Sequence, residues 1–360
     1  MKININSKEL QKKVQAVSGA IHPNPIIPIL ENVLIESDGE VIEITGSDLN
    51  NTVITKLELK ADKGSFCIPS KLLLDVLKNL PEQPIEVQVN EKFECTIIVG
   101  KSKYKIACEN TINFPKIPAL EGKEIVLKSD ILLNAINTAS WACSTDELRP
   151  SMTGMLFEGN GECIDFCALD TLKLVHITNP IADIEIKAII GKKQLNILKS
   201  ILPLGLDVSI FVTDKNISFK FGEIEIIGQV INEKYPPYKS VIPKADKNLE
   251  LNKQELINSI KRVSLFSNKT TNMVKFSISE TELIITSEDL DYSHEGSETI
   301  DISFLHNFEI GINAKHLLEI LPNVKGELIT ASFSESDKAI LIKGSADNEL
   351  FLTMPVMLNK

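Results

Sequence analysis

The sequence of 360 residues lacks any apolar run that reaches the roughly 18 residues needed for a membrane-spanning helix. Its opening residues, MKININSKEL, contain no apolar segment typical of a signal peptide, so we expect a cytoplasmic protein. The six cysteines are scattered, without a CxxC pair or a nearby histidine. This pattern argues against a structural zinc site and favours reduced thiols.

Motifs for phosphate binding and metal catalysis are also missing. The sequence contains no GxxxxGK[ST] or GxGxxG loop and no HExxH. Its five histidines lie far apart, and acidic pairs such as Glu288-Asp289 are typical of solvated loops. We therefore expect a protein without catalytic activity, cofactor or metal. A hydrolase or thiol enzyme on a repeated scaffold stays open as an alternative, which a screen of thiol reactivity would expose.

What the sequence does contain is a helical segment that recurs three times. Residues 67–81, CIPSKLLLDVLKNLP, carry an apolar stripe of helical period and end at a proline. The same pattern returns 122 residues later in 190–203, and after another 122 residues in 312–322. Lys71, Lys193 and Lys315 then occupy equivalent positions, which we expect to point away from the apolar stripe.

A second repeated helix supports the same period. Residues 7–18, 129–140 and 253–264 match one another at intervals of 122 and 124 residues. A unit of about 120 residues has the size of a whole domain rather than of a solenoid repeat. We therefore expect three similar domains, with boundaries that give residues 1–121, 122–245 and 246–360.

Between the helices the sequence alternates with the two-residue period of strands, and turn signals such as Ser37-Asp38-Gly39 join neighbouring segments. Each domain has two similar halves, each with one helix and several strands. Antiparallel sheets with helices on one face define an α+β class. The expected strands are 32–37, 40–45, 52–59, 85–90, 93–99, 104–108, 155–158, 164–168, 174–178, 208–213, 217–221, 224–231, 274–279, 283–287, 328–333, 339–343 and 350–354.

Charge is distributed unevenly along the chain. The net charge is −11, yet the six repeated helices together carry +7, which leaves −18 on the rest. A basic set of helices in an acidic protein can hold a polyanion locally. Each lysine face considered alone is more typical of an ordinary solvated surface, and only the repeated arrangement makes a binding face equally consistent. Helix 129–140 is net acidic. Both interpretations of the lysine faces remain open on the sequence.

Five segments, spread in order over all three domains, resemble the bacterial β sliding clamps, the processivity subunits of DNA polymerase III. They are VSGAIHPNPIIPIL (17–30), GSDLNNTV (46–53), GMLFEGNGE (154–162), YPPYKSVIPK (235–244) and LTMPVMLN (352–359). The resemblance implies a DNA-clamp fold of three domains and a head-to-tail homodimer that closes into a ring. Such a ring encircles double-stranded DNA without sequence specificity. A clamp loader places it, and the replicative polymerase and other clamp-binding proteins are tethered to it.

The resemblance also implies where DNA and partners bind. The family often has arginine at the position of Asn24 and the segment TDGHRL where this chain has LDTLKL (169–174). DNA contacts are expected at Lys12, Asn24, Lys71, Arg149, Lys192, Lys193 and Lys315. A pocket for partner peptides is expected at Met152, Leu169, Thr171, Leu172, Lys173, Leu174, Pro236, Val241, Ala339, Leu352, Met354, Pro355, Val356 and Met357.

For the dimer interface, the resemblance implies that Tyr104 and Ile106 of one copy meet Leu265 and Phe266 of the other. An alternative is that Leu265 and Phe266 cap their helix inside the third domain. A further alternative for the whole protein is a non-catalytic repeat scaffold that binds other proteins and never meets DNA. A ring would retain a nicked circle of DNA and release linear DNA, whereas a scaffold of this kind would retain neither.

Overall fold

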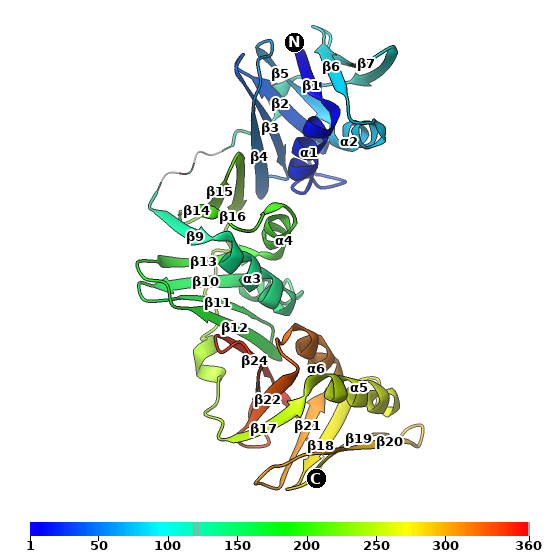
Figure 1. Ribbon diagram of the computed structural model, residues 1–360, viewed down its shortest axis with the longest axis vertical. Coiled ribbons are helices and arrows are strands. Elements are labelled where there is room, and N and C mark those ends of the chain that lie inside the picture. Colours follow the sequence, from blue (N-terminus) through cyan, green and yellow to red (C-terminus); the bar gives the residue numbers. More distant parts are fainter. Residues whose placement is uncertain (118–119, 121, 359–360) are drawn as a thin grey trace. The chain divides into compact units, whose positions relative to one another are not determined.

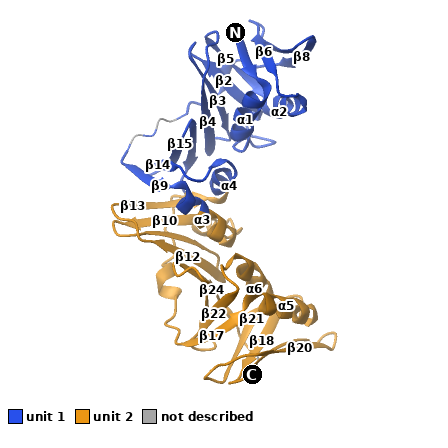
Figure 2. Ribbon diagram, in the orientation of Figure 1, with its two compact units in different colours: residues 1–133, 193–230 blue, residues 134–192, 231–360 orange. Residues whose placement is uncertain are grey.

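The computed structural model describes residues 1–117, 120 and 122–358, and in this part of the chain it contains six α-helices and 25 strands (Figure 1). The chain forms two compact units, one of residues 1–133 with 193–230 and the other of residues 134–192 with 231–360 (Figure 2). The boundary expected at residue 121 lies outside the described residues. No helix in the described ranges is long and apolar enough to span a membrane.

Every α-helix follows directly on a strand. The helices are α1 (Ser7–Ser18), α2 (Ser70–Asn79), α3 (Ser129–Ala139), α4 (Lys192–Ile201), α5 (Lys253–Val263) and α6 (Ala314–Ile320). At three of the junctions an asparagine caps the helix, since Asn6, Asn252 and Asn313 accept hydrogen bonds from first-turn backbone N–H groups. These caps let a strand turn into a helix without an intervening loop.

The expected helices are confirmed to within three residues at each end, and α1 matches its predicted range. The seventeen expected strands are all present. Eight further strands were not predicted. Six of them are the strands that run straight into the helices, and a short strand that continues into a helix has no turn residues to mark it.

The first unit contains two antiparallel sheets. One has four strands in the order β1-β6-β7-β8 (Lys2–Asn6, Pro84–Val89, Glu94–Val99, Ser102–Ala107). The other has eight in the order β5-β2-β3-β4-β16-β15-β14-β9 (Gly64–Pro69, Asn32–Ser37, Val41–Ser47, Asn51–Glu58, Ile224–Gln229, Asn216–Phe221, Asp207–Val212, Glu124–Lys128). It is joined in the middle by β4 and β16, with Val53 opposite Ile226.

The second unit repeats this arrangement. Its eight-stranded sheet has the order β13-β10-β11-β12-β24-β23-β22-β17 (Glu185–Gly191, Gly154–Asn160, Ile164–Leu169, Lys173–Asn179, Glu349–Thr353, Ile340–Lys343, Leu328–Phe333, Lys247–Asn252). It is joined by β12 and β24, with Leu174 opposite Leu352. The five-stranded sheet has the order β20-β19-β18-β21-β25 (His294–Asp301, Glu282–Asp289, Met273–Ile278, Phe308–Asn313, Pro355–Val356).

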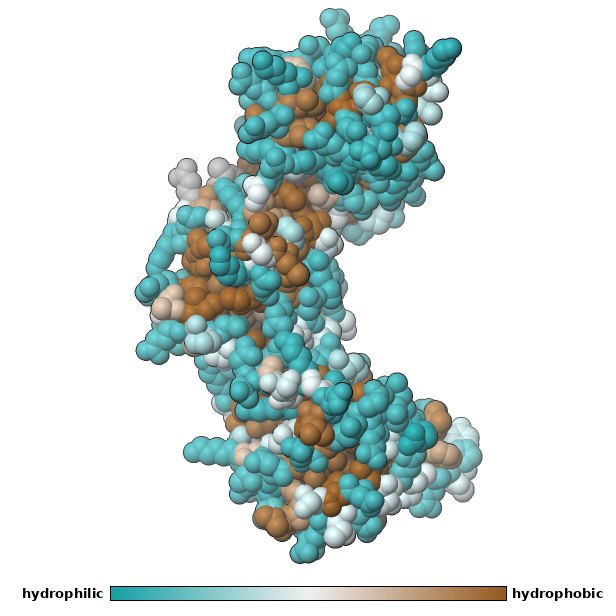
Figure 3. All heavy atoms as spheres, in the orientation of Figure 1, coloured by the Kyte–Doolittle hydropathy of each residue, from teal (hydrophilic) through white to brown (hydrophobic). Residues whose placement is uncertain are grey.

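Apolar side chains of the helices supply much of the core. In α2, Leu73 and Leu77 are buried and Lys71 and Lys78 are exposed, as the helical period predicts. The face shown in Figure 3 is mostly hydrophilic, with apolar side chains gathered in separate patches. The main candidate for a binding site is a cluster of buried apolar side chains, where a connecting segment, residues 235–241, packs on the eight-stranded sheet of the second unit.

Candidate functional site

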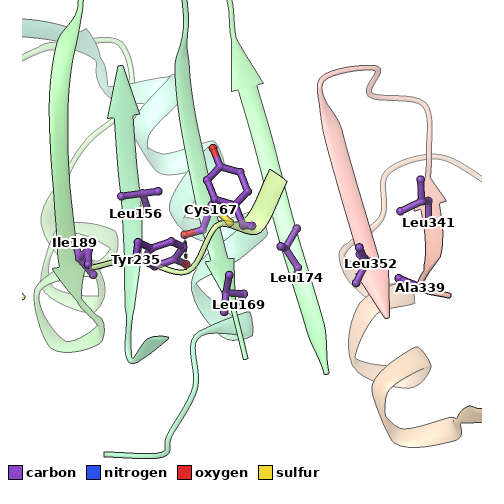
Figure 4. Close-up of a cluster of buried hydrophobic side chains, with 10 residues drawn as sticks. Leu156, Cys167, Leu169, Leu174, Ile189, Tyr235, Ala339, Leu341 and Leu352 are labelled. Atoms are coloured by element: carbon purple, nitrogen blue, oxygen red, sulfur yellow. Dashed lines mark hydrogen bonds between the residues drawn. The ribbon is translucent and has the colours of Figure 1, made fainter. Parts of the chain in front are cut away.

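An apolar cluster in the second unit forms the centre of the candidate pocket (Figure 4). It combines side chains from both halves of the eight-stranded sheet with two tyrosines of the segment that crosses it. Its buried members are Leu156, Cys167, Leu169, Leu174, Ile189, Tyr235, Tyr238, Ala339, Leu341 and Leu352. Met152 and Met354 pack against it and are only partly buried. Two flexible methionines at the margin suit a surface that adapts to different apolar ligands.

The segment of residues 235–241 is fastened to the sheet by hydrogen bonds of its side chains. Tyr235 donates to the backbone carbonyl of Cys167, with an O–O distance of 2.9 Å. Burial raises the pKa of Tyr235 and of Tyr238, so both hydroxyls remain protonated donors. Both tyrosine rings are buried in the apolar cluster, and the hydrogen bonds of their hydroxyl groups hold the segment in place on the sheet.

Asp165 is the main acceptor for this segment. It is 4% exposed, and it accepts hydrogen bonds from Lys239 Nζ at 2.7 Å, Thr178 Oγ1 at 2.7 Å and Tyr238 Oη at 3.3 Å. His176 Nε2 lies 3.1 Å from the same carboxylate. Burial by itself would raise the pKa of Asp165, but the hydrogen bonds from His176, Lys239 and Thr178 outweigh it and hold the pKa well below its usual range.

The structure brings together six of the residues expected at the pocket. Leu169, Leu174, Ala339 and Leu352 belong to the buried cluster, with Met152 and Met354 at its edge. Pro236 and Val241 lie on the crossing segment, where Val241 is 51% exposed. Leu172 is 45% exposed in the turn before β12, and its carbonyl accepts a hydrogen bond from the backbone N–H of Met354.

Among the residues expected at the pocket, Lys173 lies apart from this apolar cluster. Neighbouring residues of a strand point to opposite faces of the sheet, and Leu174 points into the cluster. The ammonium group of Lys173 lies 5.4 Å from the centre of the Trp141 ring and pairs with Glu319 of α6. Thr171 likewise lines a cavity beside Trp141 and Glu319. Both residues therefore lie on the face that carries the helices.

The expected pocket residues of the C-terminal segment lie in different places. Pro355 and Val356 form β25, which pairs with Ile312 and Gly311 of β21. Met357 lines a different cavity, on the five-stranded sheet.

Sequence reasoning missed Asp165, His176, Tyr238 and Lys239. The tyrosine pair in YPPY was a usable signal, because a tyrosine that is buried needs a hydrogen-bond partner.

The expected DNA-contacting residues differ in how free their charges are. Lys12, Lys71 and Lys315 are exposed and Lys192 is partly exposed, and none of the four makes an ion pair within the described part of the chain. Arg149 is exposed, 3.9 Å from Asp146. Asn24 is exposed in the loop after α1, and its backbone N–H donates to His22 Nδ1.

Lys193 differs from the other two repeated lysines, Lys71 and Lys315, in the contacts of its ammonium group. Its ammonium group lies 2.6 Å from Asp48 Oδ2 and 2.8 Å from the carbonyl oxygen of Ala20. The contact ties α4 to the turn between β3 and β4. Lys193 is partly exposed but its ammonium group pairs with Asp48, in contrast to Lys71 and Lys315, which make no ion pair among the described residues.

At the expected dimer interface, three of the four residues have an exposed side chain and the fourth is buried. Tyr104 is 39% exposed, but Ile106 is only 4% exposed and faces the interior of its own domain. Leu265 is 70% exposed and Phe266 40%, both in the short 3-10 helix η6 (Ser264–Phe266). Phe266 packs against Gly296 of β20, since a Cβ at Gly296 would lie 2.6 Å from its ring.

Three family models match successive parts of the chain. They describe the N-terminal, central and C-terminal domains of the DNA polymerase III beta subunit and match residues 1–118, 126–237 and 239–357. Among similar curated proteins, the beta sliding clamp of Chlamydia muridarum is 28% identical and that of Escherichia coli K12 25% identical. The alignments cover at least 99% of this chain and all of each relative.

Solved structures show the same fold. A DNA polymerase sliding clamp from Bacillus subtilis superimposes with a TM-score of 0.93, at 24% identity and with both chains fully covered. A DnaN sliding clamp from Pseudomonas aeruginosa, bound to griselimycin, gives a TM-score of 0.94 at 24% identity and covers 99% of this chain and all of its own.

Proposed function

This chain belongs to the DNA polymerase III beta subunit family, the bacterial beta sliding clamps, and from that membership we propose how its own residues close a ring, face DNA and bind partners. It is a non-catalytic processivity factor. It encircles duplex DNA, slides without sequence specificity, and tethers the replicative polymerase after a clamp loader has placed it. We place it in the cytoplasm, where a bacterial chromosome is copied.

The observation that carries the ring is the set of strand edges. In each eight-stranded sheet, two groups of four strands meet edge to edge, through β4 with β16 and β12 with β24. The same repeat order makes β20 equivalent to β4 and β12, and β8 equivalent to β16 and β24. Among the described residues β8 and β20 have no strand on their outer edges. Pairing β20 of one copy with β8 of another completes the third junction.

Because this contact joins two different surfaces, two copies related by a rotation form two identical junctions and leave neither β8 nor β20 unpaired. The charges suit the pairing. Lys101, Lys103 and Lys105 are exposed on and before β8, whereas β20 exposes Glu295 and Asp301. Leu265 and Tyr104 supply the exposed apolar surface on either side.

Equivalent helix positions support the same junction. Gln194 in α4 is 1% exposed and packs against Gly228 of β16, at a junction formed within the chain. Leu72 occupies the equivalent position in α2, near β8, and is 49% exposed. A leucine so exposed beside an unpaired strand edge is typical of a surface that a partner covers.

DNA retention follows from the topology of a closed ring, so the protein needs only diffuse attraction to phosphates and no reading of bases. We assign this attraction to Lys12, Lys71, Lys192, Lys315, Arg149 and Asn24. Lys193 contributes less, because Asp48 already neutralises it. Strong, fixed contacts would slow sliding, and long exposed lysine side chains avoid them.

Partner peptides bind, in this proposal, at the apolar cluster between the crossing segment and the β12–β24 junction. Apolar anchors of a short peptide displace water from Met152 and Met354, and the exposed Val241 and Leu172 form the margin. Lys173 holds α6 to the turn before β12 from the other face of the sheet, so it supports the pocket without contacting the peptide.

We keep the domain limits at residues 1–121, 122–245 and 246–360. Each of these ranges contains two successive strand-to-helix junctions, which supports the repeat on which the limits rest. The two compact units reflect a different division, in which the middle repeat shares one eight-stranded sheet with each neighbour.

The decisive experiment combines solution mass with topology. We expect a stable species of twice the mass of one chain, which a clamp loader places on a nicked circular duplex and which is released when the circle is cut. Equal retention on linear and circular DNA would contradict the ring, and absence of any retention would favour the alternative of a scaffold that binds proteins alone.

A further inference from the structure

The turn before each junction strand is built in the same way in all three repeats. An aspartate begins the turn, and its Oδ1 accepts a hydrogen bond from the backbone N–H two residues further along the chain. The three aspartates are Asp48, Asp170 and Asp289, with N–O distances of 3.0, 2.8 and 3.2 Å. The strand then begins at Asn51 in β4, at Lys173 in β12 and at His294 in β20. These three residues are therefore equivalent in the repeat.

At the two junctions inside the chain, this turn contacts the helix of the neighbouring repeat. Asp48 pairs with Lys193 in the first turn of α4, with 2.6 Å between Oδ2 and Nζ. Lys173 pairs with Glu319 of α6, and its ammonium group lies 3.5 Å from Asp170 of its own turn. An ion pair between the turn and a helix therefore accompanies both internal pairings of strands, that of β4 with β16 and that of β12 with β24.

Beside the unpaired β8, the equivalent helix is α2, which carries Asp75 at the position of Glu319. Each of these acidic residues follows four positions after one of the equivalent lysines, Lys71 and Lys315. Asp75 is exposed and makes no ion pair within the described ranges. With Tyr104 of β8 it lines a cavity of about 310 Å³, so it lies next to the open edge of the sheet.

His294 is exposed at the start of β20 and has an acidic residue on one side. In the hairpin it is directly opposite Asp289, which is 5% exposed. The ring of Tyr292 stacks on its imidazole, with ring centroids 6.0 Å apart. Lys173, its equivalent, has an aspartate on its own turn and a glutamate on the facing helix. His294 lacks the second of these carboxylates within the described chain, and Asp75 occupies the place from which it would come.

We propose that His294 of one copy pairs with Asp75 of the other across the junction of β20 with β8, so that the ring closes more tightly when this histidine is protonated. The inference rests on the proposed function, because it takes the two open edges to be paired in a ring. A protonated imidazole donates a charge-assisted hydrogen bond to a carboxylate, which is stronger than a neutral one. Association therefore favours the protonated form, and the dimer weakens as the pH rises through the histidine range.

The other charged groups around His294 are carboxylates, lysines and an arginine. They are Asp289, Asp291 and Glu295 on its own hairpin, and Lys71 of α2 and Lys105 of β8 on the facing copy. Arg262 of α5, which packs on β20, is held by Glu298 at 2.6 Å. Side chains of these types ordinarily keep their charge between pH 6 and pH 8, where histidine changes it. The other four histidines lie outside β8, β20, α2 and α5.

The test measures the dissociation constant of the dimer by analytical ultracentrifugation at pH 6 and at pH 8. We expect the parent dimer to be roughly fivefold tighter at pH 6, because each ring then gains two partly exposed ion pairs. Asp75→Asn and His294→Gln should each give a weaker dimer at pH 6, with a dissociation constant that no longer depends on pH. Both side chains are exposed, so circular dichroism should show unchanged folding.

Two further variants separate this pairing from a general effect of pH. His294→Lys should give a tight dimer at both pH values, because it reproduces the contact of Lys173 with Glu319. His306→Gln removes an exposed histidine elsewhere in the same unit and should keep the pH dependence of the parent. A parent dimer that is equally tight at pH 6 and pH 8, or an Asp75→Asn dimer as sensitive to pH as the parent, would overturn the pairing. A parent that stays monomeric at both pH values would instead refute the ring itself.

Discussion

Lys239 and Asp165 are 74 residues apart in the sequence, yet the ammonium group of one lies 2.7 Å from the carboxylate of the other. The hydrogen bond raises the pKa of Lys239, so the lysine stays charged and the pair persists over a wide pH range. It fastens the segment of residues 235–241 over the strands that carry the apolar cluster. The shape of the proposed partner pocket therefore depends on a hydrogen bond between two side chains beneath its wall.

Replacing Asp165 by asparagine should weaken partner binding without opening the ring. The change removes the negative charge and one of the two acceptor oxygens that Lys239, Tyr238 and His176 share, so we expect the segment to loosen and peptide affinity to fall on the order of tenfold. Unfolding free energy should fall by about 1–3 kcal/mol, the usual cost of leaving buried partners unpaired. Fluorescence anisotropy of a labelled polymerase peptide measures the first effect, and chemical denaturation the second.

Asp246→Asn serves as the control for that variant, because its carboxylate is 83% exposed in the same unit. Solution mass should show dimers for both variants. An Asp165→Asn protein that binds the peptide as tightly as the parent would contradict the role of the contact.

The lowered pKa of Asp165 predicts that the free energy of unfolding depends on pH in the acid range. The pKa of Asp165 in the folded protein lies below its unfolded value of about 3.9, so the stabilisation is fully present above that value and is lost as the pH falls further. The difference in unfolding free energy between the parent and Asp165→Asn should be constant between pH 6 and pH 8 and should shrink below about pH 4. A difference that grows in acid would show the opposite pKa shift. Urea denaturation across this range measures it.

Ring closure should depend on the exposed apolar residues near β20. Leu265→Ala with Phe266→Ala removes side chains that are 70% and 40% exposed, so we expect little loss of folding and conversion of the dimer to a monomer in analytical ultracentrifugation. Because every subunit contributes to both junctions, one altered surface breaks both of them. Ile106→Ala instead leaves a hole inside its domain and should lower thermal stability first. A full-strength dimer of the double variant would refute the proposed junction.

Reversing the free lysine charges should impair loading onto DNA. Lys12→Glu, Lys71→Glu and Lys315→Glu together make each subunit six charge units more negative. The altered helices then repel a DNA duplex, which carries about one negative charge per 1.7 Å. The protein should remain a dimer that binds partner peptides, yet load poorly onto primed circles at low salt and partly recover as salt screens the repulsion. Lys193 is left out, because a glutamate there would face Asp48 and destabilise the first unit.

A control for these substitutions is Lys60→Glu with Lys92→Glu and Lys234→Glu, three exposed lysines outside the helices with the same change in charge. Loading assays at several salt concentrations compare the two triple variants. Equal loading by both would show that the lysines on the helices are an ordinary solvated surface.

The local periods of the sequence determined the helices, most of the strands and the threefold repeat. Spacings of two and of three to four residues are set by the geometry of a strand or helix, so Leu73 and Leu77 could be placed on a buried face without any tertiary information. The same spacing could not distinguish Lys71 from Lys193, because the two lysines occupy equivalent positions in the repeat. The strands that enter the helices were missed because a five-residue segment such as KININ passes into α1 without a turn.

Tertiary structure alone decided which charges are free and which side chains meet. Asp48 engages Lys193 across 145 residues, and Asp165 engages Lys239 across 74, contacts that depend on how distant strands and segments come together. The register of β12 against β24 puts Leu174 in the pocket and Lys173 on the other face with Trp141 and Glu319. A one-residue change of register would exchange these two faces, and no local pattern excludes it.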